Sequence, residues 1–234
     1  MKINLLLPIA GNGQRFVDGG YQLPKPLILT KGKRIVDRSL ESVEIGVCNL
    51  IFIVRKEHIE KFSIDKILKE TYNDCSIITV DYLTDGALST CLLAKEYINN
   101  NEPLVIFTPD CYFEPKIDPS IIDKKYDGMV CVFNSSSDAH SYVQLDSDNE
   151  FVIKTAEKEV ISNMAIGGLY YFKTGKMFVD HAEYMIENNI RTKNEFYIAP
   201  VYNLLIEQNY KIGIDKNTRH DILGTPNDLE KINV

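Results

Sequence analysis

The segment Leu5-Leu6-Leu7-Pro8-Ile9-Ala10-Gly11-Asn12-Gly13-Gln14-Arg15-Phe16, followed by Leu23-Pro24-Lys25-Pro26-Leu27, carries most of the information in this chain of 234 residues. The apolar run at residues 3–7 is short and continuous, which is typical of a buried strand in a parallel sheet. Gly11 and Gly13 come soon after it. Because neither has a side chain, the backbone can turn sharply and bring its N–H groups against an anion. The segment therefore predicts a strand followed by an anion-binding loop.

Two cationic side chains accompany this loop. The guanidinium of Arg15 suits phosphate oxygens, and Lys25 lies on a segment stiffened by Pro24 and Pro26. A polyphosphate held by the loop would meet both charges.

Three other interpretations of the loop were weighed. The dinucleotide fingerprint needs a third glycine where Phe16 stands, and a Walker loop needs Gly-Lys-Ser/Thr, which the sequence lacks. The third is a plain turn, with Arg15 and Lys25 as solvated surface charges. That would be the better interpretation of an isolated Gly-x-Gly. It is disfavoured here only because further motifs follow in order along the chain.

Composition limits the class of protein. With 44% hydrophobic and 25% charged residues the chain can bury a full core, and a single α/β domain over residues 1–234 is expected. The formal net charge of −7 and the absence of a dense basic stripe argue against a nucleic-acid partner.

Cysteines and hydropathy indicate the compartment. The five cysteines are scattered and never spaced as Cys-x-x-Cys, which favours neither a disulfide framework nor a zinc site. We find no charged-then-apolar leader and no apolar run long enough to cross a bilayer, so we expect no membrane partner and a cytoplasmic location.

Short apolar runs alternate with helical patterns along the chain, which predicts a mainly parallel sheet with helices packed on it. Predicted strands are residues 49–54, 76–80, 104–107 and 129–133; predicted helices are residues 35–45, 58–70, 87–99, 177–188 and 194–208. Residues 142–145 and 151–153 bracket a turn-prone stretch and predict a hairpin.

Ligands bind outside the carboxyl ends of parallel strands, so the residues just past each strand are candidates. Thr84, Asp85, Gly86 and Ala87 follow the strand that ends near Val80. Gly86 could let the backbone approach a flat base, and Thr84 could read the base edge. Equally, Thr84 or Asp85 is simply the N-cap of the next helix.

Asp110 follows the strand at residues 104–107, where an exposed carboxylate is well placed for a hard cation such as Mg²⁺. A lone aspartate after a strand is usually a turn residue, so a second ligand is needed. Asp221, in His220-Asp221-Ile222-Leu223-Gly224-Thr225-Pro226, is the candidate.

Taken in this order, the motifs resemble those of the sugar-phosphate nucleotidyltransferases over nearly the whole chain. The family's entry motif, roughly Ala-Gly-x-Gly-x-Arg-Phe with Pro-Lys-Pro after it, is similar to residues 10–16 and 24–26. Its base-reading segment looks like residues 84–87, and its first metal aspartate looks like Asp110. The resemblance implies a Rossmann-like, three-layer α/β fold of the A-type glycosyltransferase kind with a mainly parallel mixed sheet. It implies a nucleotide-binding part over about residues 1–115.

The remainder of the chain would bind the acceptor and supply the second metal aspartate. That aspartate looks like Asp221, although two residues separate it from Gly224 where the family has one. A Glu-Lys pair that contacts the acceptor in the family is similar to Glu157-Lys158, here followed by Glu159 instead of proline. The acceptor-binding residues implied by the resemblance are Tyr142, Glu157, Lys158, Asn163 and Gly168, with Val143 replacing a family glycine after Tyr142.

The resemblance also implies roles. Asp110 and Asp221 would hold Mg²⁺, Arg15 and Lys25 would be catalytic, and Lys158 would neutralise the attacking phosphate. The implied nucleotide-binding residues are Pro8, Ala10, Gly11, Asn12, Gly13, Thr84, Asp85, Gly86, Ala87 and Asp110.

Within the family the residues look most like the cytidylyltransferases of bacterial capsule pathways, which implies CTP, phosphoglutamine as acceptor, and a part in making capsular phosphoramidate. The alternatives are a UTP- or dTTP-dependent transfer to a hexose 1-phosphate and a non-catalytic, nucleotide-sensing subunit. Relatives are often dimers or tetramers, so the resemblance leaves a homo-oligomer open.

Overall fold

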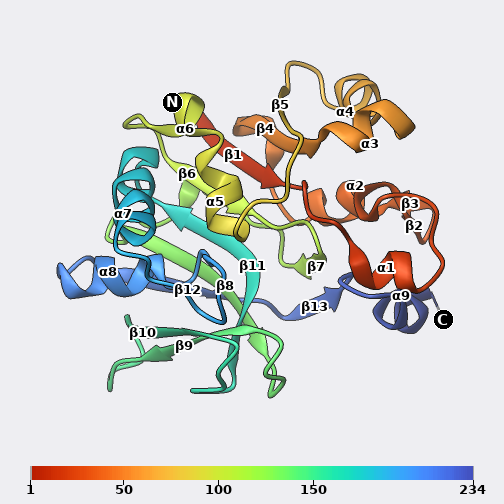
Figure 1. Ribbon diagram of the computed structural model, residues 1–234. Coiled ribbons are helices and arrows are strands. Elements are labelled where there is room, and N and C mark those ends of the chain that lie inside the picture. Colours follow the sequence, from red (N-terminus) through yellow and green to blue (C-terminus); the bar gives the residue numbers. More distant parts are fainter. Residues whose placement is uncertain (1, 234) are drawn as a thin grey trace.

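The computed structural model describes residues 2–233 and places a nine-stranded mixed sheet between two layers of helices (Figure 1). Four neighbouring strands at one side of the sheet are parallel: β6 (Leu104–Phe107), β1 (Ile3–Pro8), β4 (Cys48–Arg55) and β5 (Ser76–Val80). Their carboxyl ends therefore meet at one edge, where the loops that carry Gly11, Arg55 and Asp110 begin.

The rest of the sheet is mostly antiparallel. β11 (Met164–Phe172) pairs with β6, with β8 (Gly128–Asn134) and with β9 (Ser141–Leu145), and β9 pairs with β10 (Val152–Glu157). β12 (Ile212–Lys216) lies parallel to β8. Two small ribbons lie outside this sheet: β7 (Cys111–Glu114) with β13 (Arg219–Ile222), and β2 (Leu29–Thr30) with β3 (Lys33–Arg34).

The helices are short apart from α7. The α-helices are α1 (Gln14–Asp18), α2 (Ile35–Leu40), α3 (Lys56–Phe62), α4 (Ile64–Thr71), α5 (Ala87–Leu92), α6 (Lys95–Ile98), α7 (Gly175–Glu187), α8 (Val201–Glu207) and α9 (Pro226–Asn233). Single 3₁₀ turns are η1 (Lys25–Leu27), η2 (Ile45–Val47) and η3 (Pro119–Ile121). Among the described residues, no helix is both long and apolar enough to cross a bilayer.

The side chains of β1 show how the layers form. Leu6 belongs to a core cluster with α5, α7 and α8, whereas Leu5 and Leu7 belong to a second cluster with α2 and α4. Side chains alternate between the two faces of a strand, so a continuous apolar run is needed when both faces are covered. The three-layer α/β fold predicted from the sequence is confirmed, as are the strands at residues 76–80 and 104–107.

Four predicted helices are shorter or broken in the structure, and the one expected at residues 35–45 ends at Leu40. The helix expected at residues 58–70 is interrupted at Ser63, which has a φ of 53° and separates α3 from α4. The helix expected at 87–99 divides into α5 and α6. The helix expected at 194–208 begins only at Val201, because the backbone N–H and C=O of Phe196 bond to Asp85 and Leu88 instead.

Candidate active site

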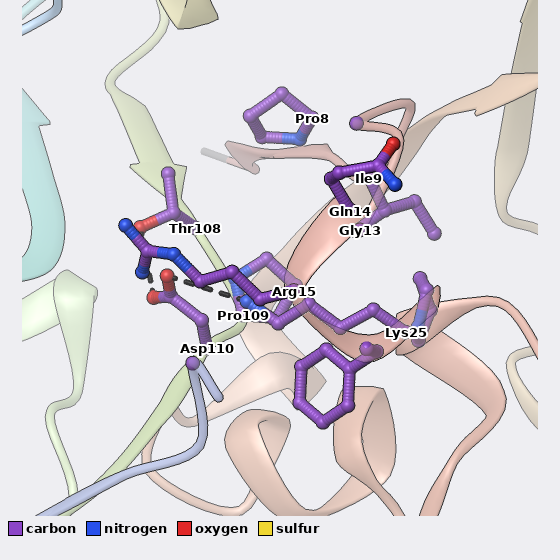
Figure 2. A pocket seen from close by; sticks show the side chains of 13 residues that line it. Pro8, Ile9, Gly13, Gln14, Arg15, Lys25, Thr108, Pro109 and Asp110 are labelled. Carbon is purple, nitrogen blue, oxygen red and sulfur yellow. Dashed lines mark hydrogen bonds and ion pairs between the residues drawn. The ribbon is translucent and has the colours of Figure 1, made fainter. Parts of the chain in front are cut away.

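The N-terminal loop and the end of β6 form the first cavity, of about 380 Å³, and Figure 2 shows its lining. Gly11, Gly13, Arg15 and Lys25 line it from the N-terminal segment, and Asp110 lines it from the end of β6. Lys25 Nζ lies 3.4 Å from Asp110 Oδ2. The cavity size is that of an ordinary small-ligand site, so the predicted phosphate-binding residues surround a space that can hold a ligand.

The backbone at Gly13 explains why the loop needs glycine there. Gly13 has φ +60°, and a Cβ added to it would lie 3.4 Å from Lys25 Cβ. Its carbonyl accepts hydrogen bonds from the amides of Phe16 and Val17, which start α1. The left-handed conformation of Gly13 thus places the start of α1 next to Lys25.

A second cavity of about 510 Å³ adjoins the first. Four residues line both cavities and form what we call their shared mouth: Arg15, Thr108, Asp110 and Gly224. Beyond this shared mouth, the second cavity is lined mainly by β8, β9, β10, β11 and β13 and by the loops between them. Arg15 and Asp110 can therefore reach ligands in both spaces.

Asp110 is held by backbone contacts. Its carbonyl accepts a hydrogen bond of 2.7 Å from the amide of Leu223, and the Thr108 hydroxyl lies 3.4 Å from Asp110 Oδ1. Gly168 lines the second cavity with φ +78°, and a Cβ added there would lie 2.7 Å from Thr108 Oγ1. Because Gly168 has no side chain, the Thr108 hydroxyl can occupy its position next to the Asp110 carboxylate.

Asp221, the second expected metal ligand, lines neither cavity, so its pairing with Asp110 on a metal ion stays a prediction. The Asp221 carboxylate accepts hydrogen bonds of 3.2 and 2.6 Å from the guanidinium of Arg219. Its neighbours in β13, His220 and Ile222, line the second cavity, whereas Asp221 does not. Side chains alternate along a strand, so the additional residue between Asp221 and Gly224 turns this carboxylate to the other face.

Metal ligation can be judged from the donors present. Among residues 2–233 no group of three or more histidine, cysteine, aspartate or glutamate side chains is arranged to hold a metal ion. Mg²⁺ is commonly held by one or two carboxylates together with substrate phosphates and water. Asp110, at the mouth of both cavities, fits that use, and Asp221 in its present position does not.

Glu157 lines the second cavity at the end of β10. Its Oε2 accepts a hydrogen bond from the hydroxyl of Ser141 on the neighbouring strand. Burial raises the pKa of Glu157, and the Ser141 bond and nearby lysines only partly oppose that effect. Glu157 thus fits its expected place beside a bound acceptor.

The other residues expected to contact an acceptor are placed differently. Lys158 Nζ donates to Tyr197 Oη and does not line either cavity. Tyr142 is fully buried, with its hydroxyl bonded to the Ser137 carbonyl at 2.6 Å. Asn163 is exposed, and its carbonyl accepts from the amide of Ser135. Of the five acceptor residues implied by resemblance, only Glu157 and Gly168 line the second cavity.

Lys158 nevertheless keeps its charge. Burial alone would lower its pKa, but the Tyr197 hydrogen bond and nearby carboxylates outweigh burial and raise it. The residue has φ +55°, and its amide bonds to the His140 carbonyl.

Residues 84–87 form the turn that leads into α5, whose first residue is Ala87. The hydroxyls of Thr84 and Thr90 lie 2.5 Å apart, and both also donate to the Gly86 carbonyl. Asp85 binds Arg191 at 3.0 Å. A Cβ at Gly86 would lie 2.5 Å from the Phe196 carbonyl oxygen, so the missing side chain makes room for protein backbone. Neither cavity is lined by this turn, and a base-reading role for it stays a prediction.

The remaining loop residues have distinct roles. Pro8 lines the first cavity, whereas Ala10 is buried in the core and lines neither cavity. Asn12 Oδ1 accepts from Arg55, at the end of β4, and Arg55 also lies 3.7 Å from Glu57. Our sequence reasoning missed Arg55, although it ends a strand parallel to β1 and so could have been expected at this edge.

An aromatic stack on one wall of the second cavity was also missed. The His220 ring lies parallel to Phe133, with centroids 3.9 Å apart, and parallel to Phe113 on its other side, at 6.1 Å. Burial lowers the pKa of His220 to about 4, so the ring is neutral near pH 7. No sequence signal pointed to this stack, because its members come from three distant strands.

The comparison with family models gives one match that covers nearly the whole chain. The model described as "Nucleotidyl transferase" matches residues 5–234. Among curated proteins, the "Bifunctional protein GlmU" of Methanocaldococcus jannaschii is 26% identical over 99% of this chain and 53% of its own length. The GlmU protein of Methanococcus maripaludis strain C7 is 25% identical over 99% of this chain and 54% of its own. The chain thus spans about half the length of the curated relatives it matches.

Solved structures share the fold. The nucleoside-diphosphate-sugar pyrophosphorylase of Vibrio cholerae RC9 superposes with a TM-score of 0.84 at 24% identity, covering 98% of this chain and 99% of the other. The inositol-1-phosphate CTP transferase of T. maritima gives 0.75 at 14% identity, covering 99% and 96%. A putative glucose-1-phosphate thymidylyltransferase of Bacillus anthracis gives 0.77 at 17% identity, covering 100% and 94%.

Proposed function

Because the chain belongs to the nucleotidyl transferase family, we propose that it couples a nucleoside triphosphate to a small phosphorylated acceptor and releases pyrophosphate. The observation that carries the proposal is the position of three charges around the glycine loop: Arg15 and Asp110 line both adjoining cavities, and Lys25 lines the first beside Asp110. One cavity suits the triphosphate, and the other suits the acceptor.

In the proposed reaction an oxygen of the acceptor phosphate attacks the α-phosphorus of the triphosphate. A new P–O bond forms there as the bond between the α-phosphorus and its bridging oxygen breaks, and pyrophosphate leaves with that oxygen. The acceptor phosphate is largely ionised near pH 7, since its second pKa is about 6, so no general base is needed. The protein's task is to align the two phosphates and neutralise their charge.

The loop residues would divide that task. The amides at Gly11 and Gly13, with the guanidinium of Arg15, would stabilise the departing pyrophosphate. Lys25 lies 3.4 Å from Asp110 and would meet the charge that grows on the α-phosphate. Lys158 is bonded to Tyr197 and would have to turn from it to neutralise the attacking phosphate.

Asp110 would hold Mg²⁺ together with substrate oxygens. When bound, the ion neutralises phosphate charge and helps to align the attacking and leaving groups. Asp221, hydrogen-bonded to Arg219, is not included in this set.

For the specific substrates we propose CTP and phosphoglutamine, in capsule modification. The support is the resemblance of the N-terminal loop to capsule-pathway cytidylyltransferases, together with Glu159 and Val143 at positions where sugar-specific relatives differ. Transfer from UTP or dTTP to a hexose 1-phosphate is the second candidate, favoured by the fold shared with the thymidylyltransferase. A non-catalytic subunit is disfavoured because Arg15, Lys25 and Asp110 are all retained. A triphosphate substrate and five free cysteines suit a reducing cytoplasm.

Pyrophosphate release tests the proposal. CTP, UTP, dTTP, ATP and GTP are each assayed with Mg²⁺, once with phosphoglutamine and once with a panel of hexose 1-phosphates. Release restricted to CTP and phosphoglutamine supports both specific substrates. Release only with a sugar phosphate selects the second candidate, and no release with any combination rejects nucleotidyl transfer.

A further inference from the structure

The second cavity has charges of opposite sign on different elements. Its described cations are Arg15, at the mouth shared with the first cavity, and Lys231, on α9. Glu157 lines it from the end of β10. In the sheet, β9, β11 and β6 lie between β10 and β1, the strand that leads into the N-terminal loop (Figure 1). An acceptor whose phosphate lies at the Arg15 mouth would therefore extend toward a carboxylate.

Glu157 differs from the other two carboxylates of this cavity. Asp110 pairs with Lys25, and at the start of α9 Asp228 Oδ2 accepts from the Thr225 hydroxyl, which in turn accepts from the Asp228 amide. Glu157 has only the hydroxyl of Ser141, which donates to Oε2. Among the described residues no cation lies within 4.0 Å of the Glu157 carboxylate, and nothing donates a hydrogen bond to Oε1.

The neighbouring lysines, Lys158 and Lys193, only partly compensate this charge. The ammonium of Lys158, the next residue, donates a hydrogen bond to the Tyr197 hydroxyl and not to Glu157. The imidazoles of His140 and His220 also line the cavity, and burial lowers the pKa of both, which disfavours their charged form. Burial raises the pKa of Glu157 itself, as expected for an anion that lacks a cationic partner.

A partly buried carboxylate without a cation is costly unless a ligand supplies one. We infer that the acceptor carries an ammonium group as well as its phosphate, and that Glu157 binds this ammonium through the oxygen that Ser141 leaves free. The acceptor class is then a phosphorylated amine: an amino acid, amino sugar or amino alcohol bearing one phosphate. This inference rests on the proposed nucleotidyl transfer and adds the group that selects the acceptor.

The aromatic wall agrees with such a ligand. Phe133 and His220 are stacked, and Tyr170 lines the same cavity. Aromatic faces attract cations, and neutral rings do not repel them. A ligand with hydroxyls alone would leave the Glu157 charge without a counter-charge.

The experiment compares matched acceptors in the pyrophosphate assay, with whichever triphosphate is turned over. The pairs are phosphoglutamine against its Nα-acetyl derivative, glucosamine 1-phosphate against glucose 1-phosphate, and phosphoethanolamine against ethylene glycol monophosphate. In the pair that the protein uses best, we expect kcat/KM to be at least about tenfold higher for the amine than for its neutral analogue. A tenfold difference is what the loss of one charge-assisted hydrogen bond costs.

Variants assign the preference to Glu157. In Glu157→Gln the amine preference should fall to within about threefold of unity, while the affinity for the same triphosphate, measured by calorimetry, stays unchanged. The matched control is Glu159→Gln, two residues beyond Glu157, just past the end of β10 and exposed to solvent, which should keep the full preference.

The outcomes separate this inference from the proposed function. Equal use of amine and neutral analogue by the wild-type protein overturns the inference and leaves nucleotidyl transfer standing. An amine preference that survives Glu157→Gln overturns the assignment to this residue. No pyrophosphate with any acceptor overturns the proposed function and the inference together.

Discussion

Lys25 Nζ lies 3.4 Å from Asp110 Oδ2, which joins the N-terminal loop to the end of β6 in the first cavity, where Asp110 also borders the second. The two residues are 85 positions apart in the sequence and meet because β1 and β6 are adjacent parallel strands. A lysine so placed can neutralise phosphate, and the aspartate beside it can hold a cation. Both charges are therefore available where two phosphates would meet.

Removing either charge should abolish most turnover. Lys25→Ala and Asp110→Asn are each expected to lower kcat by about 10²–10³-fold, the usual cost of losing a group that stabilises transition-state charge. Steady-state pyrophosphate release measures the effect, and circular dichroism checks the fold. The matched control is Lys56→Ala, whose ammonium is exposed on α3 and 3.9 Å from Glu60. Full activity in Lys25→Ala would remove Lys25 from the mechanism.

Asp221 should contribute little to metal dependence. Its carboxylate is bound to Arg219 and lines neither cavity, so Asp221→Asn should leave the Mg²⁺ concentration for half-maximal activity within about threefold of the wild-type value. The free energy of unfolding should fall by less than about 1 kcal/mol, since Arg219 is half-exposed and surface ion pairs are weak. Activity restored only at much higher Mg²⁺ would show instead that Asp221 turns to the metal during turnover.

Arg55 and Asn12 should act as one unit. Arg55 donates to Asn12 and so orders the glycine loop, and we expect Arg55→Met to raise the KM for the triphosphate about tenfold with little change in kcat. Asn12→Ala should have a similar effect. In the double variant the two effects should not add, because both remove the same contact. Additive losses in a double-mutant cycle would mean that Arg55 acts on the nucleotide independently of Asn12.

Gly86 should be far less tolerant of a side chain than Gly32. Both have positive φ, +116° and +77°, but a Cβ at Gly86 would lie 2.5 Å from the Phe196 carbonyl oxygen, and at Gly32 nothing lies within 4 Å. Gly32→Ala should cost about 1–2 kcal/mol in unfolding free energy from backbone conformation alone. Gly86→Ala should cost about 2 kcal/mol more from overpacking. Urea unfolding measures both, and equal losses would show that Phe196 moves aside freely.

The sequence predicted the central fold well because its strands are covered on both faces. Continuous apolar runs such as residues 104–107 have few other interpretations, and the glycine loop with Lys25 and Asp110 follows from the common edge of a parallel sheet. The acceptor side was harder to predict. Asp221 lies one residue further from Gly224 than the family motif has it. Because side chains alternate between the two faces of a strand, that one additional residue places Asp221 on the opposite face of β13.

Other misses came from contacts between distant segments. No local pattern predicts that Gly86 packs on Phe196, or that Lys158 binds Tyr197 instead of lining the cavity. The stack of Phe113, His220 and Phe133 likewise depends on three strands meeting in space. Such features are decided by tertiary packing, which local pattern does not encode.

The most direct test of the central claim is the identity of the product. The wild-type protein is incubated with CTP, phosphoglutamine and Mg²⁺, and the mixture is followed by phosphorus NMR and mass spectrometry. The account predicts inorganic pyrophosphate and, in equal amount, a new compound in which the cytidine α-phosphate is joined to the acceptor phosphate. Release of the γ-phosphate alone, or unchanged CTP with this and every other phosphorylated acceptor, would contradict it.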